Sequence, residues 1–250
     1  MLARIINYLT PAFLLLLSAF FGAKALLLRL FFTTTTFRDV WFALFWQYSG
    51  PRFFAKDHAS VSRLVSQCRG KVLDIGPGSG EMIKHLPRPP LITHVYGLEP
   101  NIRMHAQLQK VIDAEGLTDI YTILPFGAED ADALRGAGLE AGSVDTVLTV
   151  RVLCSLGEKR LEGALAGLFE CLKPGGQWLV FEHVRNGRCV VSGALQEFYQ
   201  IFWPWMFAGC NLNRRTREML SRTGKWDVND LVDLREEEHW EIAPMLGGGW

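Results

Sequence analysis

The feature that most constrains the fold is an apolar segment that runs directly into a cluster of glycines, VLDIGPGSG over residues 72–80. Lys71–Ile75 is short, apolar and β-branched, which predicts a strand. Glycines placed directly after a strand let the backbone turn tightly and approach a ligand. The run is GxGxG rather than the GxGxxG of dinucleotide-binding loops, and the absence of a following Gly-Lys-Ser/Thr excludes a P-loop. The segment therefore predicts a strand followed by a ligand-binding loop.

The rest of the chain alternates strand-like and helix-like segments. Asn101 is a plausible N-cap for the helix that follows it, and Lys173-Pro174-Gly175-Gly176 ends another. Such alternation implies an α/β fold with a parallel sheet, helices on both faces and a ligand at the carboxyl ends of the strands. We expect strands at 71–75, 94–98, 119–124, 144–150 and 177–184, and helices at 79–85, 101–115 and 158–172.

Two acidic segments follow the second and third expected strands. Glu99 ends the second strand, where a carboxylate can accept hydrogen bonds from both hydroxyls of a ribose. Residues 127–130, GAED, form a short acidic loop after the third strand, and such a loop can receive the amino group of an adenine. A solvated turn is the alternative for GAED. Both a nicotinamide cofactor and an adenosyl cofactor would use the Glu99 contact.

The ordered motifs VLDIGPGSG, GLEPN, GAED, SVDTVLTVRVLCS and LKPGG resemble the Rossmann-like class I methyltransferases, among which the ubiquinone/menaquinone methyltransferase type is most similar. The resemblance covers residues 71–184. It implies S-adenosyl-L-methionine as cofactor, with Glu99 on its ribose and Ala128 and Glu129 beside its adenine. The residues that would hold the amino-acid end of the cofactor are Asp74, Gly76, Gly78 and Gly80.

A narrower resemblance involves VLCS at 152–155, FEHV at 181–184, GCNL at 209–212 and the apolar N-terminus. These segments resemble membrane-anchored methyltransferase-like proteins that methylate alkyl thiols, and related proteins of fungal secondary metabolism. The resemblance implies a lipophilic small-molecule substrate and a membrane of the endoplasmic reticulum or a lipid droplet. The acceptor can be a thiol, an amine or a hydroxyl.

Methyl transfer requires an aligned acceptor and the exclusion of water. His183 and Glu182 end the fifth expected strand on the same edge, so His183 is the candidate general base and Glu182 a second catalytic candidate. A hydrogen-bonded structural role is the alternative for both. We expect Cys154 and Cys210 to be buried small side chains. Five cysteines without a CxxC pair argue against a disulfide framework and a metal site.

The N-terminus is expected to attach the protein to a membrane. Pro11–Ala23 is uncharged but shorter than the roughly 20 residues that cross a bilayer. Tyr8–Phe32 is long enough, and its Lys24 and Arg29 can snorkel to the interface. Both a tilted membrane-spanning helix and an interfacial helix fit this segment. The competing explanations are a signal peptide, a transit peptide and a buried core helix. The aromatic segment Phe37–Phe54 could lie on the membrane as a second helix.

This interpretation divides the chain into a membrane-anchoring region, residues 1–55, and a catalytic domain, residues 56–250. Arginines concentrated after the apolar segment place the domain in the cytosol. Acidic and basic residues balance at 26 each, which gives no reason to expect a nucleic-acid partner.

The sequence also bears on two alternative functions. A nicotinamide-dependent oxidoreductase would need a GxxxGxG loop and a Tyr-x-x-x-Lys pair, and the sequence has neither. A non-catalytic scaffold would be favoured by a defective last strand. The closing hairpin of such a fold would use Trp226–Leu234 and Ile242–Trp250, and the second of these contains Pro244 and three glycines, so we expect it to be short, frayed or missing.

Overall fold

The computed structural model describes residues 1–28, 37–55, 58–234 and 238–249. Arg29 and residues 30–32, at the end of the expected membrane segment, lie outside the described residues. So do residue 56, at the expected domain boundary, and Trp250, at the end of the expected last strand.

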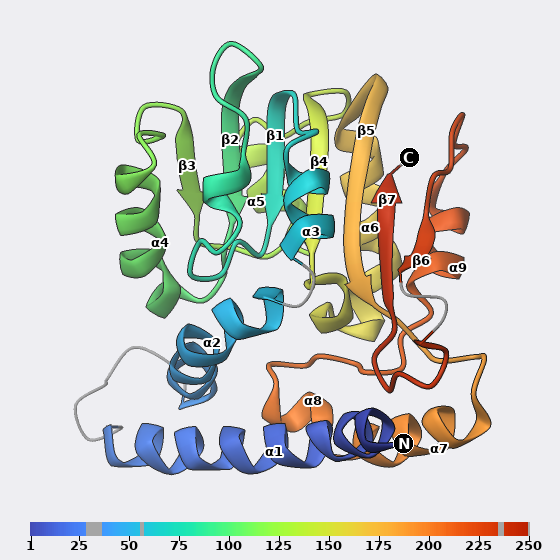
Figure 1. The fold of residues 1–250 in the computed structure, drawn as a ribbon. Coiled ribbons are helices and arrows are strands. Elements are labelled where there is room, and N and C mark those ends of the chain that lie inside the picture. The colour runs from blue at the N-terminus through green and yellow to red at the C-terminus, as the bar shows by residue number, and fades with distance from the viewer. Residues whose placement is uncertain (29–36, 56–57, 235–237, 250) are drawn as a thin grey trace.

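The centre of the molecule is a seven-stranded sheet in the order β3-β2-β1-β4-β5-β7-β6 (Figure 1). The first five strands are parallel, whereas β7 runs antiparallel to both β5 and β6. The α/β prediction is therefore confirmed, with an antiparallel hairpin at one edge. The strands are β1 (Gly70–Ile75), β2 (Ile92–Leu98), β3 (Tyr121–Leu124), β4 (Val144–Val150), β5 (Leu172–His183), β6 (Val232–Leu234) and β7 (Met245–Gly249).

Helices cover both faces of this sheet. The successive strand residues Val72 and Leu73 belong to two different hydrophobic clusters, one on each face. Helices α3 (His58–Val65) and α4 (Ile102–Ala114) pack on the Val72 side, and α5 (Ala131–Gly136), α6 (Glu158–Cys171) and α9 (Thr216–Thr223) pack on the Leu73 side (Figure 1). Burial on both faces explains why the strands are continuously apolar instead of alternating with polar residues.

The expected helix starts are largely confirmed. Asn101 caps α4, because its side chain accepts a hydrogen bond from the backbone nitrogen of Arg103 at 3.1 Å. Helix α6 lies within the expected range 158–172. The segment 79–85, in contrast, is a turn followed by the three-residue 3-10 helix Ile83–His85.

The last strand is present, but it is shorter than the expected range Ile242–Trp250, because β7 covers Met245–Gly249. β7 pairs with five consecutive residues of β5 and with β6, so it completes the sheet. Close packing requires a glycine at position 248: Gly248 has a φ of 139°, and a Cβ there would lie 2.3 Å from the carbonyl oxygen of Asp230. Glycine therefore permits close backbone approach at this edge.

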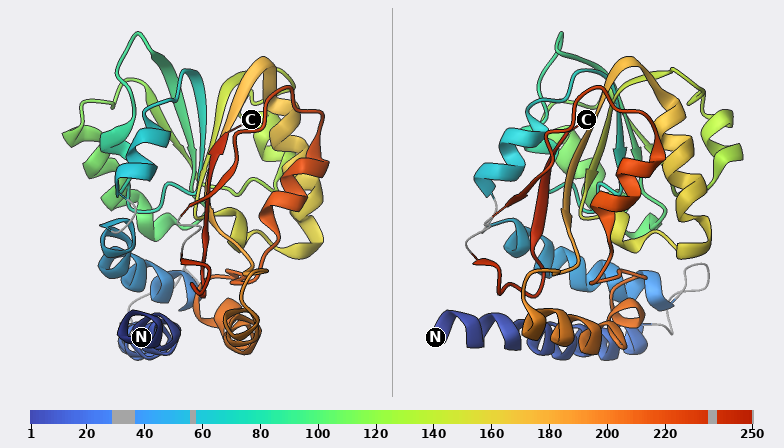
Figure 2. Two further views of the ribbon diagram at one scale, coloured as in Figure 1. Left: turned by 45° about the vertical axis from the view of Figure 1, so that its right-hand side comes forward. Right: turned by 90° about the vertical axis from the view of Figure 1, so that its right-hand side faces the viewer.

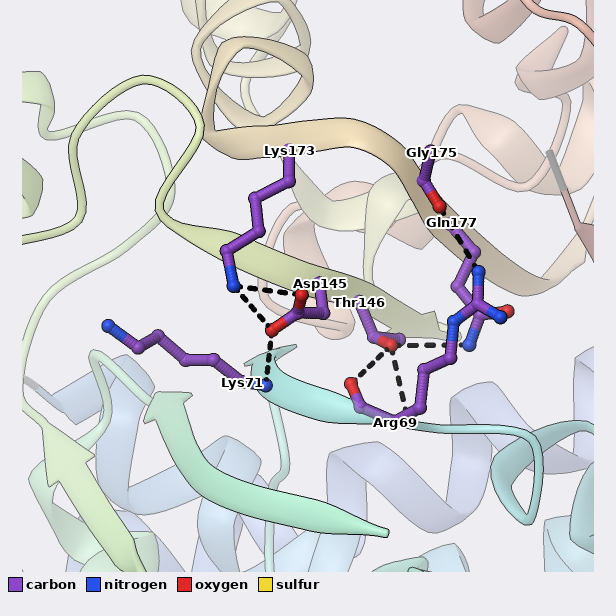
Figure 3. Close-up of polar contacts among 7 residues, drawn as sticks. All are labelled: Arg69, Lys71, Asp145, Thr146, Lys173, Gly175 and Gln177. Atoms are coloured by element: carbon purple, nitrogen blue, oxygen red, sulfur yellow. Dashed lines mark hydrogen bonds and ion pairs between the residues drawn. The ribbon is translucent and has the colours of Figure 1, made fainter.

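The amino ends of the strands are joined by a polar cluster around Asp145 (Figure 3). Its carboxylate accepts hydrogen bonds from the backbone nitrogen of Lys71 and from Lys173 Nζ, both at 2.8 Å. Thr146 Oγ1 next to it donates to the carbonyl oxygen of Arg69 at 2.9 Å. These contacts join β1, β4 and β5 at the edge opposite the carboxyl ends of the strands, so Asp145 has a structural role.

Four helices form a layer below the carboxyl ends of the strands (Figures 1 and 2). They are α1 (Leu2–Leu28), α2 (Phe37–Ala55), α7 (Val190–Gln200) and α8 (Trp203–Met206). By length and hydropathy, α1 could cross a membrane, although the core helix of a soluble protein or a signal sequence can meet the same criteria. The aromatic segment expected on the membrane forms α2, whose Trp41 and Phe45 are buried against the rest of the protein.

Candidate functional site

The loop after β1 contains three glycines with positive φ angles, a conformation that other residues adopt only with strain. Gly76, Gly78 and Gly80 have φ angles of 64°, 61° and 91°. At Gly76 space adds a second constraint, since a Cβ would lie 2.6 Å from Val152 Cγ2, in the segment after β4. The loop thus packs closely against the carboxyl end of β4 and presents its backbone at the edge of the sheet.

Glu99 joins the end of β2 to this loop. One carboxylate oxygen accepts a hydrogen bond from the backbone nitrogen of Gly78 at 3.0 Å, and the other accepts one from the backbone nitrogen of Asn101 at 2.9 Å. The side chain is buried. The structure therefore brings two of the expected site residues, Glu99 and Gly78, into direct contact.

Three carboxyl groups gather around the loop. Asp74 is buried at the end of β1 and accepts a hydrogen bond from the Tyr121 hydroxyl at 2.9 Å. Burial raises the pKa of Asp74 to about 6. Burial, together with the charges of Asp74 and Glu81, raises the pKa of Glu99 to about 7, and burial also raises the pKa of Glu81. The arrangement favours a cationic ligand, because a nearby positive charge would stabilise the ionised forms.

Helix α2 covers the loop. Trp46 Nε1 lies 2.8 Å from where a Cβ would stand on Gly78, and Glu81 Oε1 lies 2.7 Å from the equivalent point on Gly50. The Asn101 side chain donates a hydrogen bond to the carbonyl oxygen of Asp39 at 3.0 Å. Helix α2, which lies in the region expected to anchor the protein, therefore covers one side of the candidate cofactor site.

The expected adenine-binding segment follows β3 at the same edge of the sheet. Ala128 is buried in the hydrophobic cluster that also contains Leu98, whereas the Glu129 side chain is exposed. Asp130 caps α5 by accepting a hydrogen bond from the backbone nitrogen of Ala133 at 3.0 Å. Ala128 thus belongs to the same cluster as Leu98, the residue before Glu99, and the acidic loop is ordered by its own helix cap.

A cavity of about 630 Å³ opens on the α4 side of the loop. Phe54, Gly80, Glu81, Gln107 and Val111 are among its lining residues. The cavity extends the candidate site beyond the glycines toward α2 and α4.

At the acceptor side, Glu182 holds the segment after β4. Its Oε1 accepts hydrogen bonds from the backbone nitrogens of Val152 and Leu153, both at 2.8 Å. This contact matches the structural alternative considered for Glu182. The carboxylate is fully buried, which raises its pKa.

His183 lies within a group of two thiols. Its Nε2 is 3.2 Å from Cys210 Sγ, which in turn is 3.3 Å from Cys154 Sγ. One ring nitrogen of the histidine expected to act as general base thus faces a cysteine of the protein itself. Both cysteines are buried, as expected.

Sequence reasoning missed three contributors to this site: Trp46 of α2, Tyr121 on Asp74, and the approach of the two cysteines to His183. Tyr121 could have been found from the sequence, because it lies within the expected strand 119–124, which pairs with β2. No local sequence pattern identifies Trp46 or the two cysteines as part of the site, because they reach it from segments that are far apart in the sequence.

Comparison with known families agrees with this architecture. Residues 73–180 match a family described as "Methyltransferase domain". A human protein named thiol S-methyltransferase TMT1A is 28% identical over 172 residues, which cover 69% of this chain and 66% of the relative. The alignment thus spans just under two thirds of that protein's length.

Solved structures share the fold at low sequence identity. An O-methyltransferase family protein from Burkholderia thailandensis superposes with a TM-score of 0.61 at 16% identity, covering 82% of this chain and 58% of the other. An O-methyltransferase-like protein from Nostoc punctiforme gives a TM-score of 0.58 at 17% identity, covering 83% and 60% of the two chains.

Proposed function

We propose that this chain is a class I, Rossmann-like S-adenosylmethionine-dependent methyltransferase that binds S-adenosylmethionine at the glycine loop and methylates a lipophilic small molecule bearing a thiol. The proposal rests chiefly on the contact between Glu99 and Gly78, which places a buried carboxylate directly on the loop. Glu99 would accept hydrogen bonds from the ribose hydroxyls. Asp74, Gly76, Gly78 and Gly80 would hold the amino-acid end, and Ala128 and Glu129 would flank the adenine.

The charge of the site supports this cofactor. S-adenosylmethionine carries a sulfonium and an ammonium group, and both would be stabilised by the cluster of Asp74, Glu81 and Glu99. Helix α2, which covers the site, would exclude water from the reacting methyl group.

The surroundings of Cys154 and Cys210 support a lipophilic acceptor. Both cysteines belong to a hydrophobic cluster that includes Phe45, Trp203 and Phe207. This cluster connects the segment after β4, through Cys154, to α1, α2, α7 and α8. A thiol is favoured among the possible acceptors because the human relative is named a thiol S-methyltransferase.

An exposed apolar face supports membrane association. Phe13, Leu16 and Phe20 of α1 are 62%, 72% and 65% exposed, and Trp205 of α8 is 76% exposed. The two views of Figure 2 show α1 and α7 side by side at the bottom of the molecule. Exposed apolar residues on neighbouring helices form a surface suited to a bilayer.

The way in which α1 is attached favours an interfacial position over a full span. Ser18 Oγ donates to the carbonyl oxygen of Met206 at 3.0 Å, and Tyr199 donates to the carbonyl oxygen of Tyr8 at 3.0 Å. These contacts hold the helix lengthwise against α7 and α8. We therefore propose that α1 lies in the surface of a membrane, with the catalytic domain on the cytosolic side of the endoplasmic reticulum or on a lipid droplet.

The experiment is calorimetry with S-adenosylhomocysteine on the full-length protein in detergent micelles, followed by mass spectrometry after incubation with labelled cofactor and a panel of alkyl thiols, amines and phenols. The proposal expects cofactor binding and label on the thiol. Absence of both binding and transfer would contradict it. Label on an amine or a phenol would support methyltransferase activity but contradict a thiol as the acceptor.

A further inference from the structure

We propose that Cys154, His183 and Cys210 bind a zinc ion whose fourth ligand is the acceptor thiol. The inference rests on the proposed function, since it gives the substrate thiol a place at the site. Sequence spacing had argued against a metal because the cysteines form no CxxC pair. The fold brings the three ligands together although they are far apart in the sequence. Cys154 follows β4, His183 ends β5 and Cys210 lies in the loop after α8.

The geometry of the three side chains fits zinc. The three candidate ligand atoms all lie within 4.8 Å of one another, with the two sulfurs 3.3 Å apart and His183 Nε2 3.2 Å from Cys210 Sγ. Two sulfurs on a tetrahedral zinc are about 3.8 Å apart and a sulfur and a nitrogen about 3.6 Å apart. The two shorter distances would each have to lengthen by about half an ångström, and the third, between Cys154 Sγ and His183 Nε2, lies within 4.8 Å, so small side-chain adjustments would accommodate the ion.

The backbone holds each ligand in place. Glu182 fixes the start of the Cys154 segment through Val152 and Leu153. The backbone nitrogen of Asn211 donates to the carbonyl oxygen of Cys154 at 2.8 Å, which ties Cys154 to the residue after Cys210. Ala208 before this turn has a φ of 50°, a conformation that an alanine rarely adopts. Such an ordered and strained turn is consistent with a binding site.

Charge and coordination number favour a catalytic ion over a structural one. Two thiolates balance the charge of Zn²⁺, so the ion and its sulfur ligands together would be neutral. Three protein ligands leave one position open, as in zinc enzymes that use two cysteines and one histidine. The ligands lie at the same edge of the sheet as the glycine loop, because Gly76 closely approaches Val152, two residues before Cys154, and we assign the open position to that side.

The resulting step is balanced without an oxidant. The substrate R–SH would bind zinc as a thiolate and release its proton to solvent. The sulfur would then form a bond to the methyl carbon as that carbon's bond to the sulfonium breaks, and the electron pair of the broken bond would remain on S-adenosylhomocysteine. The thioether product carries no charge and would dissociate from the metal. His183 would then act as a ligand in place of the general base expected from the sequence.

Metal content tests this inference. Tag-free, full-length protein prepared without chelators is analysed by inductively coupled plasma mass spectrometry, alongside Cys154→Ala, Cys210→Ala and the control Cys171→Ser, whose thiol is buried elsewhere beside Leu139. We expect one zinc per chain in the wild type and the control, and at least tenfold less in both cluster variants. S-adenosylhomocysteine affinity should stay within twofold in all four proteins, which also shows that the variants are folded.

X-ray absorption spectroscopy of the wild type gives a second reading that does not depend on variants. The zinc should show two sulfur ligands alone and three after addition of an alkyl thiol. A metal-free wild type that takes up no added zinc, zinc retained in both cluster variants, or a Cys154–Cys210 disulfide would overturn the inference. If the zinc inference failed in this way while S-adenosylhomocysteine still bound, the proposed function would be unaffected. If the protein bound zinc but neither bound the cofactor nor transferred a methyl group, the proposed function would be contradicted.

Discussion

Glu99 and Gly78 are joined by a hydrogen bond of 3.0 Å, in which a buried carboxylate at the end of β2 accepts from the backbone of the glycine loop. This contact fixes the position of the loop relative to the second strand. It also leaves the carboxylate at the edge of the sheet where the ribose of an adenosyl cofactor would lie.

Replacement of this carboxylate should weaken cofactor binding. Glu99→Gln keeps the shape of the side chain but removes the charge that strengthens hydrogen bonds to ribose hydroxyls, so we expect about 100-fold lower affinity for S-adenosylhomocysteine. Calorimetry measures the change. The matched control is Glu140→Gln, because Glu140 is exposed and lies in the loop before β4. Equal affinities in the two variants would remove Glu99 from the cofactor site.

Cofactor affinity should rise with pH. In the ligand-free protein the pKa of Glu99 is raised to about 7 and that of Asp74 to about 6, so both must lose a proton before they stabilise a cationic ligand. We expect S-adenosylmethionine to bind at least about tenfold more weakly at pH 5.5 than at pH 8. Glu99→Gln should flatten this profile above pH 6. A profile identical to that of the wild type would contradict the assignment.

The same carboxyls predict how the stability of the ligand-free protein depends on pH. Their folded pKa values lie above their ordinary values of 4.5 and 3.8, so the folded state holds protons that the unfolded state releases. Their stabilising contribution is complete below about pH 4 and is lost as pH rises through 6 to 7. Thermal melting of the wild type against Glu99→Gln isolates this contribution: the stability of the wild type relative to the glutamine variant should fall as pH rises from about 4 to 8. A constant difference would contradict the raised pKa.

Gly76 should tolerate no side chain. Gly76→Ala adds a Cβ at a φ of 64° and 2.6 Å from Val152, whereas Gly116→Ala adds one at a φ of 66° with nothing within 4 Å. We expect a loss of about 1 kcal/mol in the free energy of unfolding for Gly116→Ala and about 3 kcal/mol for Gly76→Ala. Urea denaturation of the two variants compares them. Equal losses would show that the contact with Val152 is not tight.

The exposed side of α1 should bind membranes. Leu16→Glu places a charge on this face, and Leu91→Glu places one on a residue of similar exposure at the opposite edge of the sheet. In flotation with phospholipid vesicles, Leu16→Glu should reduce the bound fraction several-fold, while Leu91→Glu should not change it. An equal response of both variants would contradict membrane contact through α1.

The sequence identified the features that depend on neighbouring residues. The strand before Gly76, the cap at Asn101 and the helix that ends before Lys173 were all predictable from local patterns. The long apolar strands predicted a sheet covered on both faces, which the two hydrophobic clusters confirm.

Features that depend on packing were not predictable in this way. The glycines of β7 predicted an interrupted strand. The reason for a glycine at position 248, the close approach of the Asp230 backbone, is visible only in the folded chain. The aromatic residues of α2 suggested a membrane, since a buried aromatic face and a lipid-facing one have the same composition. Cys154 and Cys210 are separated by 56 residues, and only the meeting of three segments places them beside His183.

The most direct test is to incubate the full-length protein with methyl-deuterated S-adenosylmethionine and a long-chain alkyl thiol and to analyse the products by mass spectrometry. The account predicts a deuterated methyl thioether and an equal amount of S-adenosylhomocysteine, both strongly reduced in Glu99→Gln. A wild-type protein that binds no cofactor and labels neither the thiol nor an amine or phenol would contradict it.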